Sequence, residues 1–362
     1  MVMKERGRGT LPELPSIWQR IGEGSRMPEP LVSVVIAARN AADTIARAVR
    51  SALREPEVSE VVVVDDASSD DTGAAAASAD DGLGRLSIIR LEVNRGPSAA
   101  RNLAIDHTTA PFIAVLDADD SYIEGRFKNL FAADGWELAA DNIVFVEEGS
   151  DARIPDRHAL AATAPLRRLG LNEFISGNIS RRGLHRGELG FLKPVVSRGF
   201  MASRRLRYNE DMRLGEDYEL YARALILGAR FKITPACGYL ASVRPDSLSG
   251  NHRTEDLLRL ADADRALLRM KGLPDEAAAT LKRHERHVRD KYRLRRFLDR
   301  KAEAGVASAI AYAFSNPANP LPIARGVAAD KAGALHRRVV PAFAKADQPP
   351  VRFLMPPRRG GR

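Results

Sequence analysis

The sequence predicts an α/β fold in which a mainly parallel central sheet is flanked by helices and followed by a helical C-terminal extension. Between residues 31 and 116, short apolar runs alternate with segments whose apolar residues recur at helical spacing. Such alternation is typical of βαβ units, which place their strands in parallel. From residue 254 onward the strand-like runs stop, and the remaining apolar residues follow a helical period.

Strands are expected where nearly every position is apolar, because the strands of a parallel sheet are buried on both faces. In the first part of the chain these runs are 31–37, 58–64, 86–91 and 112–116, with further strands at 143–146, 231–234 and 239–243. Helices are expected at 40–54, 72–80, from 96 onward and at 215–228, and in the extension at 254–271, 276–302 and 303–314. Residues 151–190 are rich in Arg, Gly and Asn and predict a loop-dominated insertion.

Composition divides the chain into four regions. Residues 1–30 are rich in Pro, Gly and charged residues and predict a poorly ordered basic leader. The α/β domain is expected over 31–250, and the helical extension over 251–315. Residues 316–362 are rich in Pro and Arg and are expected to form a tail.

The positive charge of the chain restricts its partners. The net charge is +9, which suits nucleic acid, an anionic membrane face or a phosphorylated substrate. Aromatic residues make up only 6%, and they do not interleave with basic residues as they do on nucleic-acid-binding surfaces. Nucleic acid is therefore not an expected partner.

Cysteine usage and hydropathy indicate the compartment. Cys237 is the only cysteine, which excludes a disulfide framework and a cysteine zinc site and fits a small buried residue in a reducing cytoplasm. The N-terminus lacks an apolar signal core, and no apolar run approaches the roughly 20 residues of a membrane span. We expect a cytoplasmic protein whose contact with the inner face of the cell membrane is at most peripheral.

Polar side chains follow three of the expected strands at the point where each strand ends. Asn40 follows the first, Asp65 and Asp66 end the second, and the run from Asp117 to Asp120 follows the fourth. Ligands of parallel sheets bind at these carboxyl ends. Because a carboxylate repels a phosphate unless a cation lies between them, the run predicts a divalent metal and a phosphorylated substrate. The simpler alternatives are a solvated acidic loop for the run and turn or capping chemistry for the pair.

Five segments in this order resemble the family 2 inverting glycosyltransferases, which have the GT-A (nucleotide-diphospho-sugar transferase) fold. The resemblance covers roughly residues 31–250, and it implies a nucleotide-sugar half at 31–120 and an acceptor half at 121–250. The segments are Val32-Ser-Val-Val-Ile-Ala-Ala-Arg-Asn, Val61-Val-Val-Val-Asp-Asp-Ala-Ser-Ser-Asp-Asp-Thr, Asn94-Arg-Gly-Pro-Ser-Ala-Ala-Arg-Asn-Leu-Ala, Leu116-Asp-Ala-Asp-Asp and Gly215-Glu-Asp-Tyr-Glu-Leu.

The resemblance implies a nucleoside pocket at the first two strand ends. Asp66 would accept a hydrogen bond from the uracil N–H, and Ala37, Arg39 and Asn40 would line the pocket. Arg101, which follows Gly96 at the start of a helix, would lie near the nucleotide.

The same resemblance implies a cation site for the donor diphosphate. Asp119 would hold Mg²⁺ or Mn²⁺, which prefer oxygen ligands, with help from Asp117 on the nucleotide-sugar side or from Asp120. Many relatives carry a His shortly before a Ser-x-Ser segment, where this chain has Arg244, so Arg244 is expected to contact the diphosphate instead. His252, a few residues later, is expected to be a surface residue.

The family's general base falls on Asp217, with Glu216 as its supporting neighbour. An acceptor hydroxyl must lose a proton as it attacks the anomeric carbon, and a positioned carboxylate can take that proton. A single displacement of this kind inverts the anomeric centre. The alternative is an acidic first helical turn that interacts with the helix dipole.

A narrower resemblance suggests the donor and the acceptor. The segment Val243-Arg-Pro-Asp-Ser-Leu-Ser-Gly-Asn, followed by a basic helical region, resembles the succinoglycan-type glucosyltransferases of bacterial exopolysaccharide assembly. It implies UDP-glucose, a UDP-hexose, as donor and a lipid-linked oligosaccharide as acceptor. Residues 276–302 would then lie near an anionic membrane, where each Lys or Arg contributes roughly 1 kcal/mol, unless they form a solvated helix face.

Three other functions fit parts of the sequence. A sugar-nucleotide nucleotidyltransferase shares the sheet and the metal-binding Asp, but it normally has a Gly-rich loop after the first strand, and Ala37-Ala-Arg-Asn-Ala-Ala lacks glycine. A nucleic-acid-binding protein fits the basic charge alone. A non-catalytic relative is disfavoured because Asp119 and Asp217 are both present.

Overall fold

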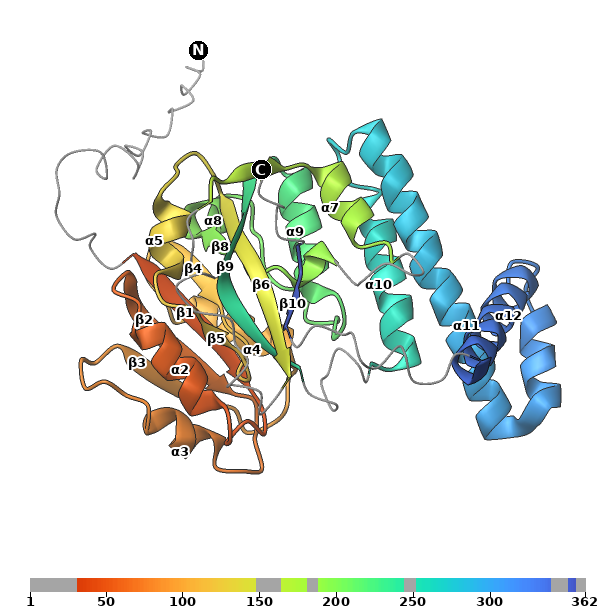
Figure 1. Cartoon of the computed structure of the whole chain (residues 1–362), viewed down its shortest axis with the longest axis horizontal. Coiled ribbons are helices and arrows are strands. Elements are labelled where there is room, and N and C mark those ends of the chain that lie inside the picture. Colours follow the sequence, from red (N-terminus) through yellow and green to blue (C-terminus); the bar gives the residue numbers. More distant parts are fainter. Residues whose placement is uncertain (1–30, 148–163, 181–187, 244–251, 340–350, 356–362) are drawn as a thin grey trace, which may run out of the picture.

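A single mixed sheet forms the centre of the molecule. The computed structural model describes residues 31–147, 164–180, 188–243, 252–339 and 351–355. The strands run in the order β3-β2-β1-β4-β8-β6-β9-β5, while β10 pairs with β6 and β7 pairs with β9 beside this path (Figure 1). The strands are β1 Val32–Ala38, β2 Val58–Asp65, β3 Leu86–Arg90, β4 Phe112–Val115, β5 Ser121–Tyr122, β6 Leu138–Glu147, β7 Arg167–Leu169, β8 Val195–Ser197, β9 Phe231–Val243 and β10 Val351–Phe353.

The first four strands form the parallel half that the sequence predicts. β1 pairs in parallel with β2 and with β4, and β2 pairs in parallel with β3. Nearly all residues of β1, β2 and β4 are buried, as expected for strands covered on both faces. Their connections contain α2 Ile45–Leu53, α3 Thr72–Ala77 and α4 Pro97–Asp106. The α/β class is therefore confirmed.

Beyond β4 the sheet becomes mixed. β8 pairs antiparallel with both β4 and β6, and β6 pairs in parallel with β9. The two strands expected at 231–234 and 239–243 form the single strand β9. Between them the register shifts, because Ala140 pairs with Ile233 while Asn142 pairs with Cys237. The extra residues include Pro235, which has no N–H for the ladder, and a bulge accommodates it within one continuous strand.

The second half also carries short helices. They are α5 Arg126–Phe131, α7 Leu171–Gly177, α8 Arg198–Ser203, α9 Glu216–Ile226 and the 3₁₀ turn η2 Leu189–Phe191. The expectation of a loop-dominated segment at 151–190 is wrong for its described part, which contains β7 and α7. The sequence feature that indicates α7 is the adjacent apolar pair Phe174 and Ile175, and both side chains are fully buried in the structure.

Three helices form the C-terminal extension. α10 Thr254–Leu267 and α11 Asp275–Phe314 pack on one another, α10 contacts α9, and α11 contacts α7 and α12 Pro320–Val339 (Figure 1). α11 covers the two helices expected at 276–302 and 303–314, with a non-helical residue, Gly305, at φ 79° between the two parts. The range 316–362 contains α12 and also β10, which composition did not predict. β10 returns to the sheet and pairs antiparallel with β6.

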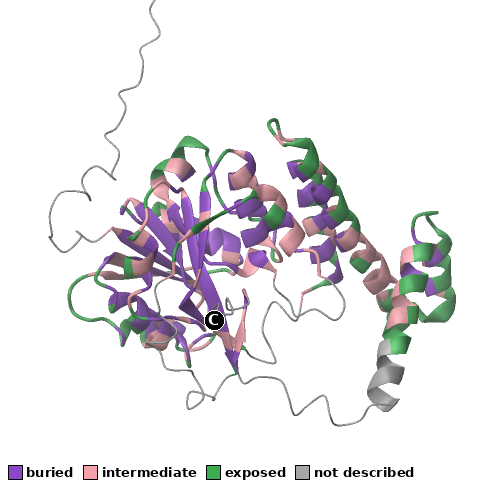
Figure 2. Cartoon of the chain, turned by 45° about the horizontal axis from the view of Figure 1, so that its top comes forward, coloured by how far each residue is buried: buried purple, intermediate pink, exposed green. Residues whose placement is uncertain are grey.

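Burial is concentrated in the sheet and decreases toward the far end of α11 and α12 (Figure 2). Phe112, Phe131 and Trp136 form an aromatic cluster in the core. Cys237 is free and buried, as predicted. None of the described helices combines the length and the apolar character that crossing a membrane requires.

Candidate active site

The end of β4 is tied to the start of α9 by a network of buried and partly buried charged side chains. Asp117, just after β4, accepts a 2.8 Å hydrogen bond from Arg101 of α4 and forms a 2.8 Å ion pair with Lys193, which precedes β8. Arg101 also donates to Glu216 at 2.8 Å, and Lys193 donates to Asp217 at 2.7 Å. The structure thus brings together four residues that the sequence assigned to one site, Asp117, Arg101, Glu216 and Asp217.

The two cations fix the protonation of this network. Burial alone would raise the pKa of Asp117, but the charges of Lys193 and Arg101 outweigh it and hold that pKa well below its ordinary value. Burial would lower the pKa of Lys193, yet Asp117 and Asp217 raise it well above its usual range. Lys193 therefore remains charged, and it keeps two carboxylates close together that would otherwise repel each other.

Asp217 sits in the first turn of α9, where the positive end of the helix dipole favours a carboxylate. Gly215 caps this helix at φ 73°, and a Cβ there would lie 2.8 Å from Leu260 Cδ1 of α10. Asp217 Oδ2 accepts from Lys193, whereas Oδ1 has longer contacts, 3.4 Å to the Tyr221 hydroxyl and 3.8 Å to Arg101. Oδ1 is thus the less tightly held oxygen of a buried carboxylate.

Asp120, one of the two expected metal ligands, has a structural role in the fold. Its Oδ2 accepts a 2.7 Å hydrogen bond from the Tyr239 hydroxyl, and its Oδ1 accepts from the Ser242 N–H at 2.9 Å. Burial raises its pKa well above the ordinary value, and the charges of Asp117 and Asp119 add to that effect. Asp120 therefore holds the turn after β4 against β9, and its place on a metal stays a prediction.

Asp119 is the remaining carboxylate of the run and is partly exposed. Its carbonyl oxygen accepts a 2.7 Å hydrogen bond from Arg47. Within the described ranges, no three His, Cys, Asp or Glu side chains gather into a metal-binding group. Mg²⁺ is commonly bound by one or two carboxylates together with substrate phosphates and water. The residues present thus fit a cation that Asp119 and a bound diphosphate would hold jointly.

The expected nucleoside residues lie at the ends of β1 and β2. The Asp66 N–H donates to the Ala38 carbonyl at 2.8 Å, which joins the two strand ends. The Asp66 carboxylate accepts from the N–H groups of Arg95 and Gly96 at 2.7 and 2.8 Å, so it fixes the loop before α4.

The other three nucleoside residues lie on the same edge as Asp66. Asn40 has φ 49° and accepts a 2.9 Å hydrogen bond from the Ser69 N–H. Arg39 and Asn40 are exposed, and Ala37 is partly buried. Arg244 lies outside the described residues.

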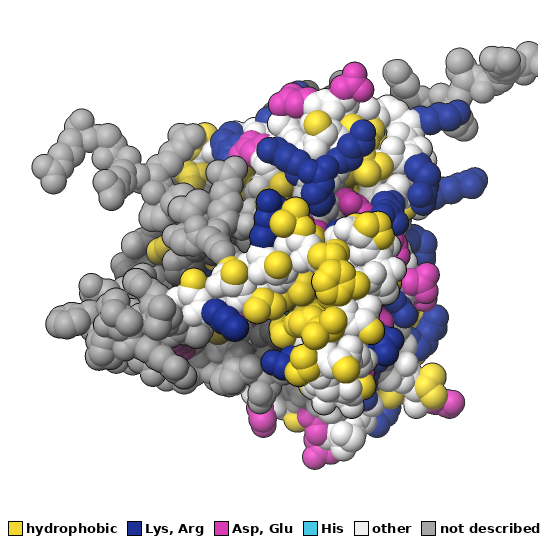
Figure 3. Space-filling model, turned by 90° about the vertical axis from the view of Figure 1, so that its right-hand side faces the viewer, with side chains coloured by type: hydrophobic (Ala, Val, Ile, Leu, Met, Phe, Trp, Pro, Cys, Tyr) yellow, Lys and Arg dark blue, Asp and Glu magenta, His cyan; other side chains and the backbone are white. Residues whose placement is uncertain are grey.

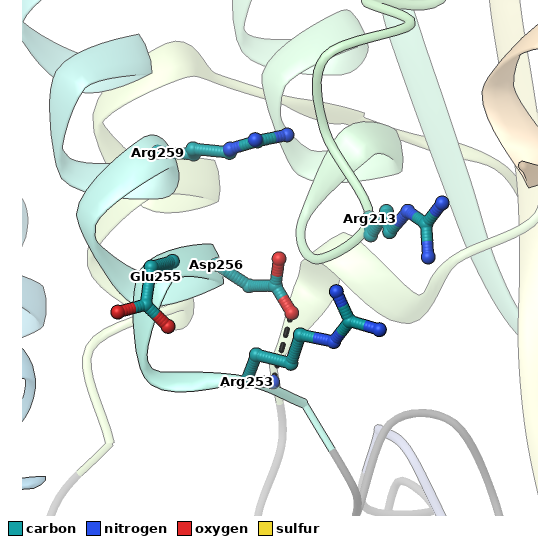
Figure 4. Close-up of a pocket in the computed structure, with 5 residues that line it drawn as sticks. All are labelled: Arg213, Arg253, Glu255, Asp256 and Arg259. Carbon is teal, nitrogen blue, oxygen red and sulfur yellow. Dashed lines mark hydrogen bonds between the residues drawn. The ribbon is translucent and has the colours of Figure 1, made fainter.

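A pocket of about 270 Å³ opens at the start of α10 and is rich in arginine. Arg253 and Arg259 face Arg213, which comes from the loop before α9, and the Asp256 carboxylate accepts from the Arg253 N–H at 2.8 Å (Figure 4). A Cβ on Gly96 would lie 4.0 Å from Arg213 Nε. The pocket thus adjoins the loop that Asp66 holds.

A second buried network connects the helical extension to α9. The Tyr218 hydroxyl donates to Asp264 of α10 at 2.9 Å, and Asp264 contacts His284 Nδ1 of α11 at 2.7 Å. The rings of Tyr218 and His284 lie 4.5 Å apart. Because Tyr218 follows Asp217 directly, α10 and α11 help to position the carboxylate.

Lys193 and Tyr239 are site residues that the sequence did not reveal. Lys193 has a usable signal, since it stands alone in the apolar run Phe191-Leu-Lys-Pro-Val-Val, where a buried lysine needs a carboxylate partner. Tyr239 has the sequence context of an ordinary strand residue, so its contact with Asp120 could not be predicted.

Comparisons with known proteins show the family to which this chain belongs. The model of the family described as Glycosyl transferase family 2 matches residues 33–205, a range that includes Arg101, Asp117 and Lys193 and ends before α9. The chain is 52% identical to the succinoglycan biosynthesis protein ExoU of Rhizobium meliloti (strain 1021), over 90% of this chain and 95% of that protein. It is 34% identical to the succinoglycan biosynthesis protein ExoO of the same organism, over 80% and 82% of the two chains.

A solved structure shows the fold. Residues 1–349 of S. aureus TarS, crystallised in complex with UDP-GlcNAc, superpose with a TM-score of 0.54 at 18% identity, over 75% of this chain and 74% of that one. The chain has the GT-A fold with a helical C-terminal region. With the family match and the similarity to ExoU, these findings show that the chain belongs to glycosyl transferase family 2 and is a sugar transferase similar to proteins of succinoglycan biosynthesis.

Proposed function

We propose that this enzyme is an inverting glycosyltransferase that moves glucose from UDP-glucose to a hydroxyl of a growing, lipid-linked oligosaccharide during exopolysaccharide assembly. Its similarity to ExoU supports the pathway class. The observation that carries the proposal is the charge network that joins the end of β4 to Asp217 at the start of α9. In this network Lys193 contacts both Asp117, the proposed donor-side carboxylate, and Asp217, the proposed base.

The donor side is proposed to lie over the ends of β1, β2 and β4. Asp66 would accept from the uracil, with Ala37, Arg39 and Asn40 around the nucleoside. Asp119 would hold Mg²⁺ or Mn²⁺ against the diphosphate, and the bound cation would neutralise charge that develops on the leaving group.

Arginines complete the proposed diphosphate site. Arg101 and Asp117 would support its inner edge, since they are paired with each other at 2.8 Å. The pocket at the start of α10, which is lined by three arginines together with Glu255 and Asp256, would supply nearby anion contacts through Arg213 and Arg253. Arg244 would contribute a further contact with the diphosphate.

The acceptor side is proposed to use Asp217 as the base and Glu216 as the residue that holds Arg101 in place. The acceptor oxygen forms a bond to the anomeric carbon, and the bond from that carbon to the diphosphate oxygen breaks. The hydroxyl proton passes to Asp217 Oδ1, the oxygen with the longer contacts. Because the nucleophile attacks opposite the leaving group, an α-linked donor gives a β-linked product.

The proposed setting is the cytoplasm, where a chain with a single free cysteine would stay reduced. A lipid-linked acceptor would then bring the enzyme to the inner face of the cell membrane.

A donor screen tests the proposal. The full chain is incubated with Mn²⁺, a lipid-linked oligosaccharide fraction and a series of UDP-, GDP- and dTDP-sugars, and nucleotide release is measured. We expect UDP release to be largest with UDP-glucose, and NMR of the product to show a β anomeric proton. Asp119→Ala should abolish the dependence on Mn²⁺, whereas the exposed control Asp134→Ala should not. Release from no nucleotide sugar, or a product with retained configuration, would overturn the proposal.

A further inference from the structure

The far end of the extension exposes an unusual amount of apolar surface. Residues 304–324 contain no charged side chain. Four large apolar residues in this segment are well exposed: Val306 at 57%, Ile310 at 50%, Phe314 at 75% and Leu321 at 58%. Figure 3 views this end of the molecule and shows hydrophobic side chains gathered into one patch. We call these four residues the hairpin face.

The hairpin face results from the way α11 turns back on itself. Gly305 has φ 79° and ψ 178°, a conformation that other residues rarely adopt, and it separates the last part of α11 from the rest. In that last part Ala309 and Ala313 are buried, while Ile310 and Phe314 one position further on point outward. The small residues thus pack inside and the large ones face solvent. This is the reverse of the arrangement that would bury most apolar area within the protein.

Basic side chains surround the hairpin face. Between residues 292 and 332 the chain has seven Lys and Arg against three Asp and Glu. Arg300, Lys301, Arg325 and Lys331 are exposed. The charges of Arg293, Arg296 and Arg300 reach Tyr312, which lies between Ile310 and Phe314 in the sequence, so these arginines are close to the hairpin. Figure 3 shows Lys and Arg around the apolar patch.

We propose that the hairpin face docks on an anionic lipid surface. A helix that exposes large apolar residues beside Lys and Arg inserts its apolar side at the level of the lipid headgroups, while the cations contact the anionic groups. Both features are present here, and the absence of a spanning helix among the described residues fits binding from one side.

A second copy of the chain is a poorer occupant of this surface. A two-fold interface places the same patch against itself, so the basic residues around each patch would face one another and repel. The inference goes beyond the proposed sugar transfer, and its test needs no nucleotide sugar.

Sedimentation with vesicles tests the proposal on the full chain. We expect binding to vesicles of phosphatidylcholine and phosphatidylglycerol in equal parts, weaker binding to phosphatidylcholine alone, and loss of the difference at high salt. Phe314→Ser should lower the partition coefficient about tenfold, which is the expected effect of removing one buried aromatic side chain. The matched control is Leu83→Ser, since Leu83 is 71% exposed and lies in a loop before β3.

A charge variant and an assembly measurement complete the test. Arg300→Gln with Lys301→Gln should weaken binding to the anionic vesicles about tenfold, while the exposed Lys271→Gln should not. The proposal is overturned if wild type and Phe314→Ser bind anionic vesicles equally, or if neither binds. It is also overturned if sedimentation velocity shows a dimer that Phe314→Ser dissociates while vesicle binding is unchanged. Loss of vesicle binding with normal UDP release would leave the proposed function standing.

Discussion

Lys193 Nζ lies 2.7 Å from Asp217 Oδ2, and both side chains are buried. Lys193 also contacts Asp117 at 2.8 Å, so one ammonium group links the carboxylate that ends β4 to the carboxylate that begins α9. A buried ion pair of this kind adds little net stability, but removing one partner leaves an uncompensated charge in the interior. The close approach of these two carboxylates, one from each half of the site, therefore depends on Lys193.

Replacing Lys193 tests that dependence. Lys193→Met should lower the free energy of unfolding by about 3–5 kcal/mol, because the buried Asp217 and the partly buried Asp117 lose their common partner. It should also reduce sugar transfer more than the stability loss alone explains. The control is Lys271→Met at an exposed position, which should change neither property. Urea unfolding and UDP release measure the two effects, and equal behaviour of both variants would contradict the account.

Tyr239 holds the turn after β4, and its hydroxyl can be removed alone. The hydroxyl donates to Asp120 at 2.7 Å and accepts from the Asp117 N–H at 3.1 Å. Tyr239→Phe should therefore cost about 1–3 kcal/mol of stability, because the buried Asp120 carboxylate and the partly buried Asp117 N–H lose their partner. It should also raise the KM for the donor. Tyr292→Phe is the control, and a Tyr239→Phe variant with the stability and KM of wild type would count against this role.

Glu55 should make the stability of the protein depend on pH. The side chain is fully buried and accepts hydrogen bonds from the N–H groups of Gly125 and Phe127 at the start of α5. Burial raises its pKa from 4.5 to about 7. The folded state therefore binds this proton more tightly than the unfolded chain. The tighter proton binding stabilises the folded state fully below about pH 4.5, and this contribution is lost as the pH rises through about 7.

Glu55→Gln removes this titration. As the pH rises from 4.5 to 8, the difference in free energy of unfolding between the variant and wild type should shift by about 3 kcal/mol in favour of the variant. One pKa unit corresponds to about 1.4 kcal/mol. Glu92→Gln, at an exposed position, is the control. Denaturant unfolding across this pH range measures the difference, and a constant difference would show that Glu55 does not titrate there.

The network of Tyr218, Asp264 and His284 should hold the start of α9, and with it Asp217, in place against the helical extension. Asp264→Ala leaves a buried hydroxyl and a buried imidazole without their partner, so we expect a loss of about 3 kcal/mol and a lower kcat with little change in KM. Asp262→Ala on the same helix should cost less than about 1 kcal/mol, because its ion pairs with Arg265 and Arg289 are on the surface. Similar kcat values for the two variants would contradict a positioning role.

The sequence predicts the parallel half of the fold, and it predicts that four site residues lie close together. The apolar runs at 31–37 and 58–64 are typical of buried strands, and strands in parallel bring their carboxyl ends to one edge. Asp117, Arg101, Glu216 and Asp217 were expected at one site from the resemblance to family 2, and they contact one another.

The remaining features depend on tertiary contacts between distant segments. Asp120 is identical to Asp119 in type and neighbourhood, and only its contacts with Tyr239 and Ser242 separate their roles. β10 is short, and it forms a strand only because the edge of β6 beyond β8 is available for pairing. The sequence predicts a helix boundary at 302–303, close to Gly305, but not the positive φ of Gly305 on which the hairpin face depends.

The central claim is that Asp217 takes the acceptor's proton during sugar transfer. The most direct measurement compares the kcat of wild type and Asp217→Asn for UDP release from UDP-glucose in the presence of acceptor. A positioned general base contributes about 10²–10⁴-fold, so Asp217→Asn should lose about that much in kcat while binding of UDP, measured by calorimetry, is kept. A kcat within a few-fold of wild type would contradict the account.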